Sequence, residues 1–178
     1  MNNFLELCEK RQSCRSYDSS RAVEREKLLK ILEAGRLTPS ACNTQPWSFV
    51  VVENPEVAAK VSEACQQIGA NAFTSDTRAF IVVLEERVTL MPKIRSLVDS
   101  QYFAKHDLGA AVASMCYQAT ELGLGTCIFG LFDREKLSKD LDIPYHYRFD
   151  TVIAVGYPKD EKIRTKHRKS IEELARFV

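Results

Sequence analysis

The sequence has 178 residues, enough for one domain with a substantial core, and its 25 basic and 24 acidic side chains leave a formal net charge of +1. This balance gives no general attraction to nucleic acid or to an anionic membrane, so any bound anion must be held by a local cluster. No apolar run approaches the roughly 20 residues that span a bilayer, and the acidic N-terminus MNNFLELCEK lacks a secretory apolar region, so we expect a single cytoplasmic domain over residues 1–178 with no nucleic-acid or membrane partner.

The first half of the chain predicts three helices and two strands. Residues 2–10 have the pattern of a short amphipathic helix, and residues 24–37 carry leucine and isoleucine at helical spacing. WSFVVVE (47–53) has the β-branched composition of a strand. The next segment, 54–69, begins with an asparagine cap before proline and stops at glycine, which indicates a third helix. AFIVVLE (79–85) predicts the second strand.

The second half predicts a buried helix and two more strands. Residues 106–125 carry apolar or small side chains on most helical faces, so we expect a central helix, with small residues that let a second subunit approach closely. Residues 126–130 and 149–158 predict strands, and residues 133–142 predict a helix between them. Few, short strands alternating with helices indicate an α+β protein, a mixed β-sheet flanked by helices.

Several kinds of site are not indicated. The six cysteines and three histidines lack the paired spacing of metal ligands, so we expect reduced thiols and no metal. No G-x-G-x-x-G follows a strand, which argues against a Rossmann dinucleotide site. Paired carboxylates and a Ser-His pair are also missing from the pattern. A bound cofactor would therefore have to carry the chemistry.

Two basic segments lie near opposite ends of the chain. RQSCRSYD (11–18) offers arginine forks and serine hydroxyls that suit a phosphate, although a solvated turn has the same composition. KIRTKHRKS (162–170) is either a solvated basic tail or a second contribution to one phosphate site. Neither segment is specific alone.

Two further segments suit a planar ligand. TPSACNTQPW (38–47) is stiffened by prolines, and its amide and hydroxyl groups, on Ser40, Asn43, Thr44 and Gln45, match the edge of a heterocycle, although ordinary turn chemistry explains part of them. In GLGTCIFGLF (123–132), Gly123 is expected to cap a helix, whereas Gly130 lets backbone N–H groups come close to a ring.

Together and in this order, these four segments resemble the FMN-dependent nitroreductase family over essentially the whole chain, most tellingly in R-x-S-x-R and P-S-x-x-N-x-Q-P-W. The resemblance implies an α+β fold and a homodimer with an intertwined C-terminal segment, with FMN at the subunit interface. It also implies ping-pong transfer of hydride from NADH or NADPH, through flavin N5, to a small acceptor such as a nitroaromatic or a quinone.

The same resemblance assigns the cofactor-binding residues, with no catalytic side chain because the flavin carries the chemistry. It implies that Arg11, Gln12, Ser13 and Arg15 contact the phosphate, the ribityl chain and the pyrimidine edge of FMN. It also implies that Lys166 and Arg168 contact the phosphate. Pro39, Ser40, Ala41 and Asn43, with Gln45 in the same loop, approach from the other subunit. Phe129 and Gly130 present backbone N–H groups to N5 and O4, so Arg15 and Gly130 are expected to tune the ring.

Departures from the family pattern leave alternatives open. Many members carry a proline and an acidic residue where Cys127 and Phe129 stand, so no side-chain contact is carried over there. The chain is short between Phe73 and His106, where larger members insert helices over the substrate. An FMN-binding or sensing protein with little turnover, a related reductive dehalogenase, and a thiol switch using Cys14 and Cys42 remain alternatives.

Overall fold

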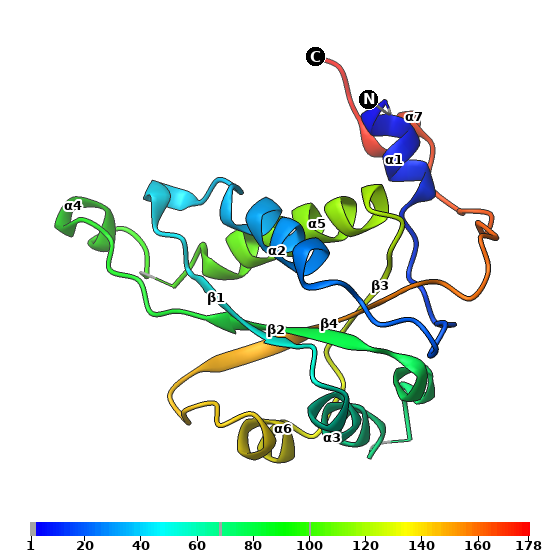
Figure 1. The fold of residues 1–178 in the computed structure, drawn as a ribbon. Coiled ribbons are helices and arrows are strands. Elements are labelled where there is room, and N and C mark those ends of the chain that lie inside the picture. The colour runs from blue at the N-terminus through cyan, green and yellow to red at the C-terminus, as the bar shows by residue number, and fades with distance from the viewer. Residues whose placement is uncertain (1–2, 68, 100) are drawn as a thin grey trace.

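The computed structural model describes residues 3–67, 69–99 and 101–178, and in these residues four strands form one sheet between two layers of helices (Figure 1). The strands are β1 (Trp47–Val52), β2 (Ala79–Glu85), β3 (Gly125–Phe129) and β4 (Arg148–Gly156), in the order β1-β2-β4-β3. One face is covered by α2 (Arg25–Arg36) and α5 (Ala104–Glu121), and the other by α3 (Pro55–Gln66) and α6 (Arg134–Asp140). The predicted α+β class is confirmed.

The direction of the strands refines the predicted mixed sheet. β1 pairs with β2, β2 with β4, and β3 with β4, all antiparallel. Among the described residues, parallel pairing is confined to an isolated bridge between Ser13 and Thr126 on the outer strand β3. Apolar runs predict that strands exist, but they carry no information about strand direction.

Strand β2 has helices on both sides, which explains its continuous apolar run. Phe80, Val82 and Leu84 pack toward α3 and α6, while Ala79, Ile81 and Val83 pack toward α2 and α5. Successive side chains of a strand point to opposite faces, so a strand covered on both faces needs apolar residues at every position. β2 therefore lies at the centre of the core.

Helix α5 is buried along one side only. Ala111, Val112 and Met115 lie in the core, whereas Gly109, Ala110 and Ala113 are exposed in the single chain. The small residues lie on the exposed side, so the single chain does not bury this helix on most faces, and its contact with a second subunit stays a prediction. Among the helices of the described residues, none is long and apolar enough to cross a membrane.

Several short elements were not predicted from the sequence. They are the 3₁₀ turns η1 (Ala41–Asn43) and η2 (Ala72–Asp76) and the helices α4 (Pro92–Arg95) and α7 (Ile171–Leu174). The first predicted helix is α1 (Phe4–Lys10), and the helix stops at Gly69 and Gly123 adopt positive φ angles of 73° and 75°, as a helix C-terminus favours. Asn2 and Ile68, which fall within predicted helices, lie outside the described residues.

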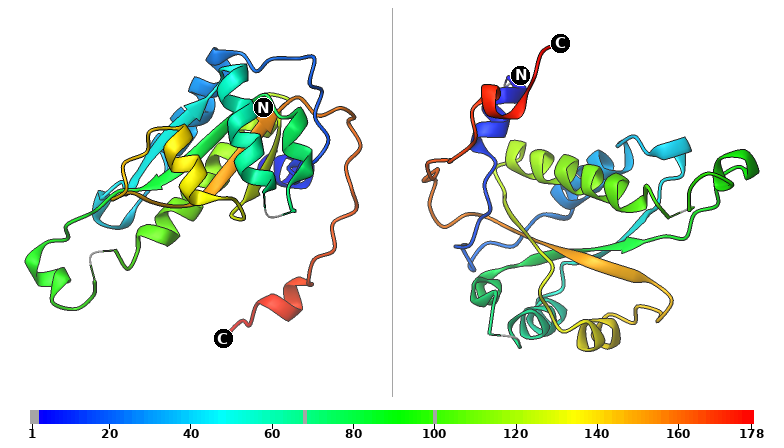
Figure 2. Two further views of the ribbon diagram at one scale, coloured as in Figure 1. Left: turned by 90° about the horizontal axis from the view of Figure 1, so that it is seen from below. Right: turned by 180° about the vertical axis from the view of Figure 1, so that it is seen from behind.

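The chain after β4 forms an extended arm, residues 159–178. The left view of Figure 2 shows this arm leaving the body and ending in α7 away from the sheet. Its apolar side chains Ile163, Ile171, Leu174 and Phe177 are exposed. Exposed apolar groups gathered on one extended segment are typical of a surface that another chain covers.

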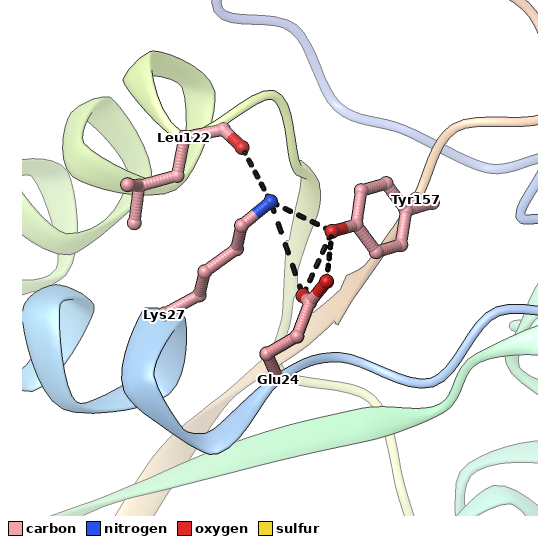
Figure 3. Close-up of polar contacts among 4 residues, drawn as sticks. All are labelled: Glu24, Lys27, Leu122 and Tyr157. Atoms are coloured by element: carbon pink, nitrogen blue, oxygen red, sulfur yellow. Dashed lines mark hydrogen bonds and ion pairs between the residues drawn. The ribbon is translucent and has the colours of Figure 1, made fainter.

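A polar cluster joins the start of α2 to the ends of α5 and β4 (Figure 3). The Tyr157 hydroxyl lies 2.8 Å and 2.7 Å from the two carboxylate oxygens of Glu24, and Lys27 Nζ donates to the same hydroxyl at 2.6 Å and to the Leu122 carbonyl at 3.2 Å. The Arg21 guanidinium stacks 3.4 Å from the centre of the Tyr157 ring. The hydrogen bond from Tyr157 lowers the pKa of Glu24.

We expect Tyr157→Phe to lower the free energy of unfolding by about 1 kcal/mol at neutral pH, because the hydrogen bonds between the Tyr157 hydroxyl and the side chains of Glu24 and Lys27 are lost. The folded carboxyl of Glu24 has the lower pKa, so its contribution is present above the pKa of the unfolded carboxyl and is lost as the pH falls through the folded value. Urea unfolding at a series of pH values measures both effects. Tyr145→Phe, at a side chain 98% exposed, is the control. A deficit in Tyr157→Phe that stays constant into acid would contradict the role of Glu24.

Candidate functional site

The N-terminal segment 11–18 is packed onto the edge of the sheet. The Cys14 N–H donates to the Thr126 carbonyl at 2.7 Å, and the Asp18 N–H donates to the Tyr157 carbonyl at 2.9 Å. A Cβ placed on Gly125 would lie 2.7 Å from Cys14 Cβ, so only glycine allows this approach. The segment is therefore a fixed part of the fold and not a solvated turn.

The C-terminal arm is tied to this segment by Gln12 and Arg164. The Gln12 amide donates to the Lys162 carbonyl at 2.8 Å, and its oxygen accepts from the Arg164 backbone N–H at 3.1 Å and from Arg164 Nε at 3.3 Å. The Arg164 guanidinium also donates to the Ser13 carbonyl. The two basic segments, about 150 residues apart in sequence, thus lie side by side.

Between them lies a cavity of about 360 Å³ with a strongly cationic wall. The N-terminal segment and the end of α1 contribute Arg11, Gln12 and Ser13, and the arm contributes Arg164, Thr165, Lys166, His167 and Arg168. Burial and the neighbouring guanidinium groups of Arg11 and Arg168 lower the pKa of Lys166. Crowded positive charges of this kind are relieved by a bound dianion, and guanidinium forks match phosphate geometry.

The structure assigns different positions to the predicted phosphate residues. Arg11, Gln12, Ser13, Lys166 and Arg168 line the cavity, whereas Arg15 is exposed and is not part of its wall. Lys166 Nζ donates to the Cys8 carbonyl at 2.7 Å and to the Glu9 carbonyl, so it also holds the last turn of α1.

Sequence reasoning missed three wall residues. Arg164, Thr165 and His167 lie in the same basic run as Lys166 and Arg168, but an extended run has no period that tells its cavity side from its solvent side.

The polar loop 38–47 is held in a strained conformation. Cys42, Asn43 and Gln45 adopt positive φ angles of 51°, 54° and 47°, a region that side-chain-bearing residues rarely occupy. The loop is fixed by Asp107 Oδ2, which accepts from the Ala41 N–H at 3.1 Å, and by Ser40 Oγ, which accepts from the Gln45 N–H at 2.9 Å. Asn43 and Gln45 are exposed, as is Pro39, while Ser40 and Ala41 are half-buried. Such strain is commonly stored where a site is preorganised.

Packing within the fold also accounts for Phe129, the last residue of β3, and for Gly130, which follows it. The Phe129 ring packs edge-on against Phe73 with 5.9 Å between ring centres. A Cβ on Gly130 would lie 2.7 Å from the Asp150 carbonyl oxygen, so glycine is required for the approach to β4. β3 is an outer strand, and the part of its outer edge beyond the Ser13–Thr126 bridge can still present backbone N–H groups.

Within one chain the cationic cavity and the polar loop are far apart. Ala41 is bound to Asp107 in the first turn of α5, whereas Ser13 pairs with Thr126, just after its last turn. An α-helix of 18 residues is about 27 Å long. Figure 1 and the right view of Figure 2 show the two regions at opposite ends of the α2–α5 pair. One chain alone therefore does not bring the predicted site residues together.

Within one chain, the geometry weighs against a disulfide between Cys14 and Cys42. Cys14 lies at one end of α5 and Cys42 at the other, too far apart for a disulfide within one chain. Burial raises the pKa of the Cys14 thiol, which reduces the thiolate needed for reaction. Burial also raises the pKa of Cys65 to about 12.

Comparison with known proteins identifies the family and the fold of this chain. The model of the nitroreductase family matches residues 8–157, and the chain belongs to that family. A relative from Archaeoglobus fulgidus, provisionally named NADH dehydrogenase/NAD(P)H nitroreductase, is 34% identical over 91% of this chain and 89% of its own length.

Two further matches show the range of the relatives. The solved structure of an FMN-dependent nitroreductase from Clostridium difficile R20291 superposes with a TM-score of 0.78 at 26% identity, covering 97% of this chain and 98% of that one. A protein from Thermotoga neapolitana named iodotyrosine deiodinase is 25% identical over 91% of this chain and 92% of its own.

Proposed function

We propose that this protein is an FMN-dependent oxidoreductase that uses NADH or NADPH to reduce a small organic acceptor such as a nitroaromatic or a quinone. Family membership supports an oxidoreductase, and the C. difficile relative is described as FMN-dependent. The observation that carries the proposal is the cationic cavity between the N-terminal segment and the arm.

The residues around this cavity fit the phosphate end of FMN. Arg11, Arg164, Lys166 and Arg168 supply positive charge, and Ser13 and Thr165 supply hydroxyl groups. When bound, FMN accepts electrons from the nicotinamide and passes them to the acceptor. The chain's part is to hold the phosphate, to present backbone N–H groups at Gly130, and to shape the ring edge with the polar loop.

We further propose a homodimer with two composite sites. The polar loop and the cationic cavity lie at opposite ends of α5, so a second copy is needed to bring an Asn43 to each cavity. The exposed apolar side chains of the arm and the small outer residues of α5 supply contact surfaces for that copy. The single domain and the cytoplasmic location expected from the sequence stay predictions.

Two alternatives to the reduction of a nitroaromatic or a quinone are each supported by one observation. Reductive dehalogenation is supported by the relative named iodotyrosine deiodinase. FMN binding with little turnover is favoured by the short stretch between β2 and α5, where α4 has only four residues.

The decisive experiment is anaerobic reduction of the FMN-loaded protein by NADH and by NADPH, followed by addition of nitroaromatic, quinone and halogenated acceptors. We expect bleaching of the flavin absorbance by a nicotinamide and its return with one acceptor class. Parallel lines in double-reciprocal plots are expected for ping-pong turnover. Protein that binds no FMN after reconstitution would contradict the proposal, and bleaching without reoxidation by any acceptor would favour the sensing alternative.

Arg164 provides a structure-based test of the cofactor site. We expect Arg164→Ala to weaken FMN binding at least about tenfold, because it removes a cation from the cavity and also removes the side-chain hydrogen bonds from Arg164 to Gln12 and Ser13. Fluorescence titration with FMN measures the affinity. Arg25→Ala, at an exposed arginine that is paired with Glu53 and does not line the cavity, is the matched control. Unchanged affinity in Arg164→Ala would remove Arg164 from the site.

A further inference from the structure

A second cationic pocket lies at the ends of the central strands β2 and β4, at the opposite end of the sheet from the Ser13–Thr126 bridge beside the first pocket. Its volume is about 460 Å³ and its walls are Arg87, Tyr145, His146 and Arg148. Arg87 follows the end of β2, and Arg148 begins β4 opposite Glu85. Two chain segments about 60 residues apart thus bring two permanent positive charges to one pocket.

In the part of the chain that the structure describes, the two arginines have no acidic partner. In residues 3–67, 69–99 and 101–178, no carboxylate lies within ion-pair distance of either guanidinium group, although other surface arginines such as Arg25 and Arg36 are paired. The carboxylate of neighbouring Glu85 instead accepts from the Gln101 amide at 2.8 Å. Unpaired arginines that converge on a cavity are suited to an external anion.

The backbone around Arg87 is fixed on both sides. The Gln101 side chain donates to the Glu86 carbonyl at 3.1 Å and accepts from the Val88 N–H at 2.8 Å. The Glu86 N–H donates to the Pro46 carbonyl at 3.0 Å. The backbone on both sides of Arg87 is therefore fixed, and through Pro46 it adjoins the polar loop.

The size of the pocket and the aromatic rings in its wall indicate a ligand larger than a simple inorganic ion. A volume of about 460 Å³ falls in the range of small-molecule sites and exceeds the needs of a bare phosphate. The Tyr145 side chain is 98% exposed, and the His146 ring lies 6.0 Å from it, edge to face. These rings offer stacking surfaces beside the guanidinium groups.

We propose that this pocket binds a nucleoside monophosphate, in which a phosphate monoester and a planar base are joined by a sugar. Arg87 and Arg148 hold the phosphate, and Tyr145 and His146 contact the base. Two sources have this chemistry: the adenosine 2′-phosphate of NADPH, and a separate mononucleotide. The NADPH source rests on the proposed function, which brings the nicotinamide to the polar loop next to this pocket.

The binding test uses the FMN-loaded protein with adenosine 2′-monophosphate and inorganic phosphate as probes in calorimetry. We expect saturable binding of adenosine 2′-monophosphate, with weaker binding of inorganic phosphate that competes for the same site. Arg87→Gln and Arg148→Gln should each weaken the nucleotide at least about tenfold, since each removes charge-assisted hydrogen bonds. Arg25→Gln, which makes the same change in charge elsewhere, should bind normally. No saturable binding by the unmodified protein, or equal binding by Arg87→Gln, overturns the proposal.

Kinetics then separate the two sources. If NADPH is the ligand, the ratio of kcat/KM for NADPH to that for NADH falls at least about tenfold in Arg87→Gln and is kept in Arg25→Gln. If the ratio is unchanged while the arginine-dependent binding of adenosine 2′-monophosphate persists, the pocket serves a separate mononucleotide. Failure of both nicotinamides to reduce the flavin would count against the proposed function, whereas the calorimetric result would still decide the pocket.

Discussion

Replacing Arg15 with alanine is expected to slow reduction of the bound flavin by a nicotinamide about a hundredfold or more, with a much smaller loss of FMN affinity. Arg15 is exposed and lies outside the wall of the cationic cavity, so under the proposed function the FMN phosphate does not depend on it. It follows the packed residue Cys14, whose backbone is fixed to Thr126. A positive charge held at the pyrimidine edge stabilises negative charge on the reduced ring and therefore acts on rate more than on binding.

Stopped-flow reduction at saturating NADPH or NADH measures this rate, and FMN titration measures the affinity. Arg15→Lys keeps the charge but loses the planar fork, so its reduction rate should fall between those of the parent protein and Arg15→Ala. Arg25→Ala should match the parent in both measurements. Normal reduction in Arg15→Ala would remove Arg15 from this role, and a large loss of affinity would instead place it on the phosphate.

Elements with a continuous or a periodic apolar pattern could be predicted from the sequence. The apolar run of β2 and the helical spacing of α2 identify these elements because each is buried in a regular way. By contrast, α4 and α7 have only four residues each, too few for a periodic signal. The α7 helix begins with a capping box between Ser170 and Glu173, a local signal that was present in the sequence.

The candidate site divides in the same way. Motifs with fixed spacing identified Arg11, Ser13 and Asn43 as candidates, but no motif shows that Arg164 turns back to Gln12, because that contact spans 152 residues. Gly130 was expected to admit a ligand, yet the structure shows that the Asp150 carbonyl already requires glycine there. The pocket at Arg87 and Arg148 depends on the register between β2 and β4, which an isolated sequence does not contain.

The largest expected effect concerns the composite site. The homodimers of Arg11→Ala and of Asn43→Ala should each lose most activity, because every site carries one lesion. A heterodimer of one Arg11→Ala subunit and one Asn43→Ala subunit should recover about half of the parent activity. Both lesions then fall in one site, while the other site receives an intact Arg11 from one chain and an intact Asn43 from its partner.

The matched control places both substitutions on one subunit and pairs it with an unmodified chain. The number of lesions is the same, but each site now contains one of them, so activity should stay near that of the single variants. Two different affinity tags allow each heterodimer to be purified, and NADPH or NADH consumption and FMN content are measured per dimer. Equal activity in the two arrangements, or a fully active monomer in sedimentation, would contradict shared sites. The α5 geometry argues for the sharing, since about 27 Å of helix separates the Asp107 that fixes the polar loop from the strand that fixes the cationic cavity.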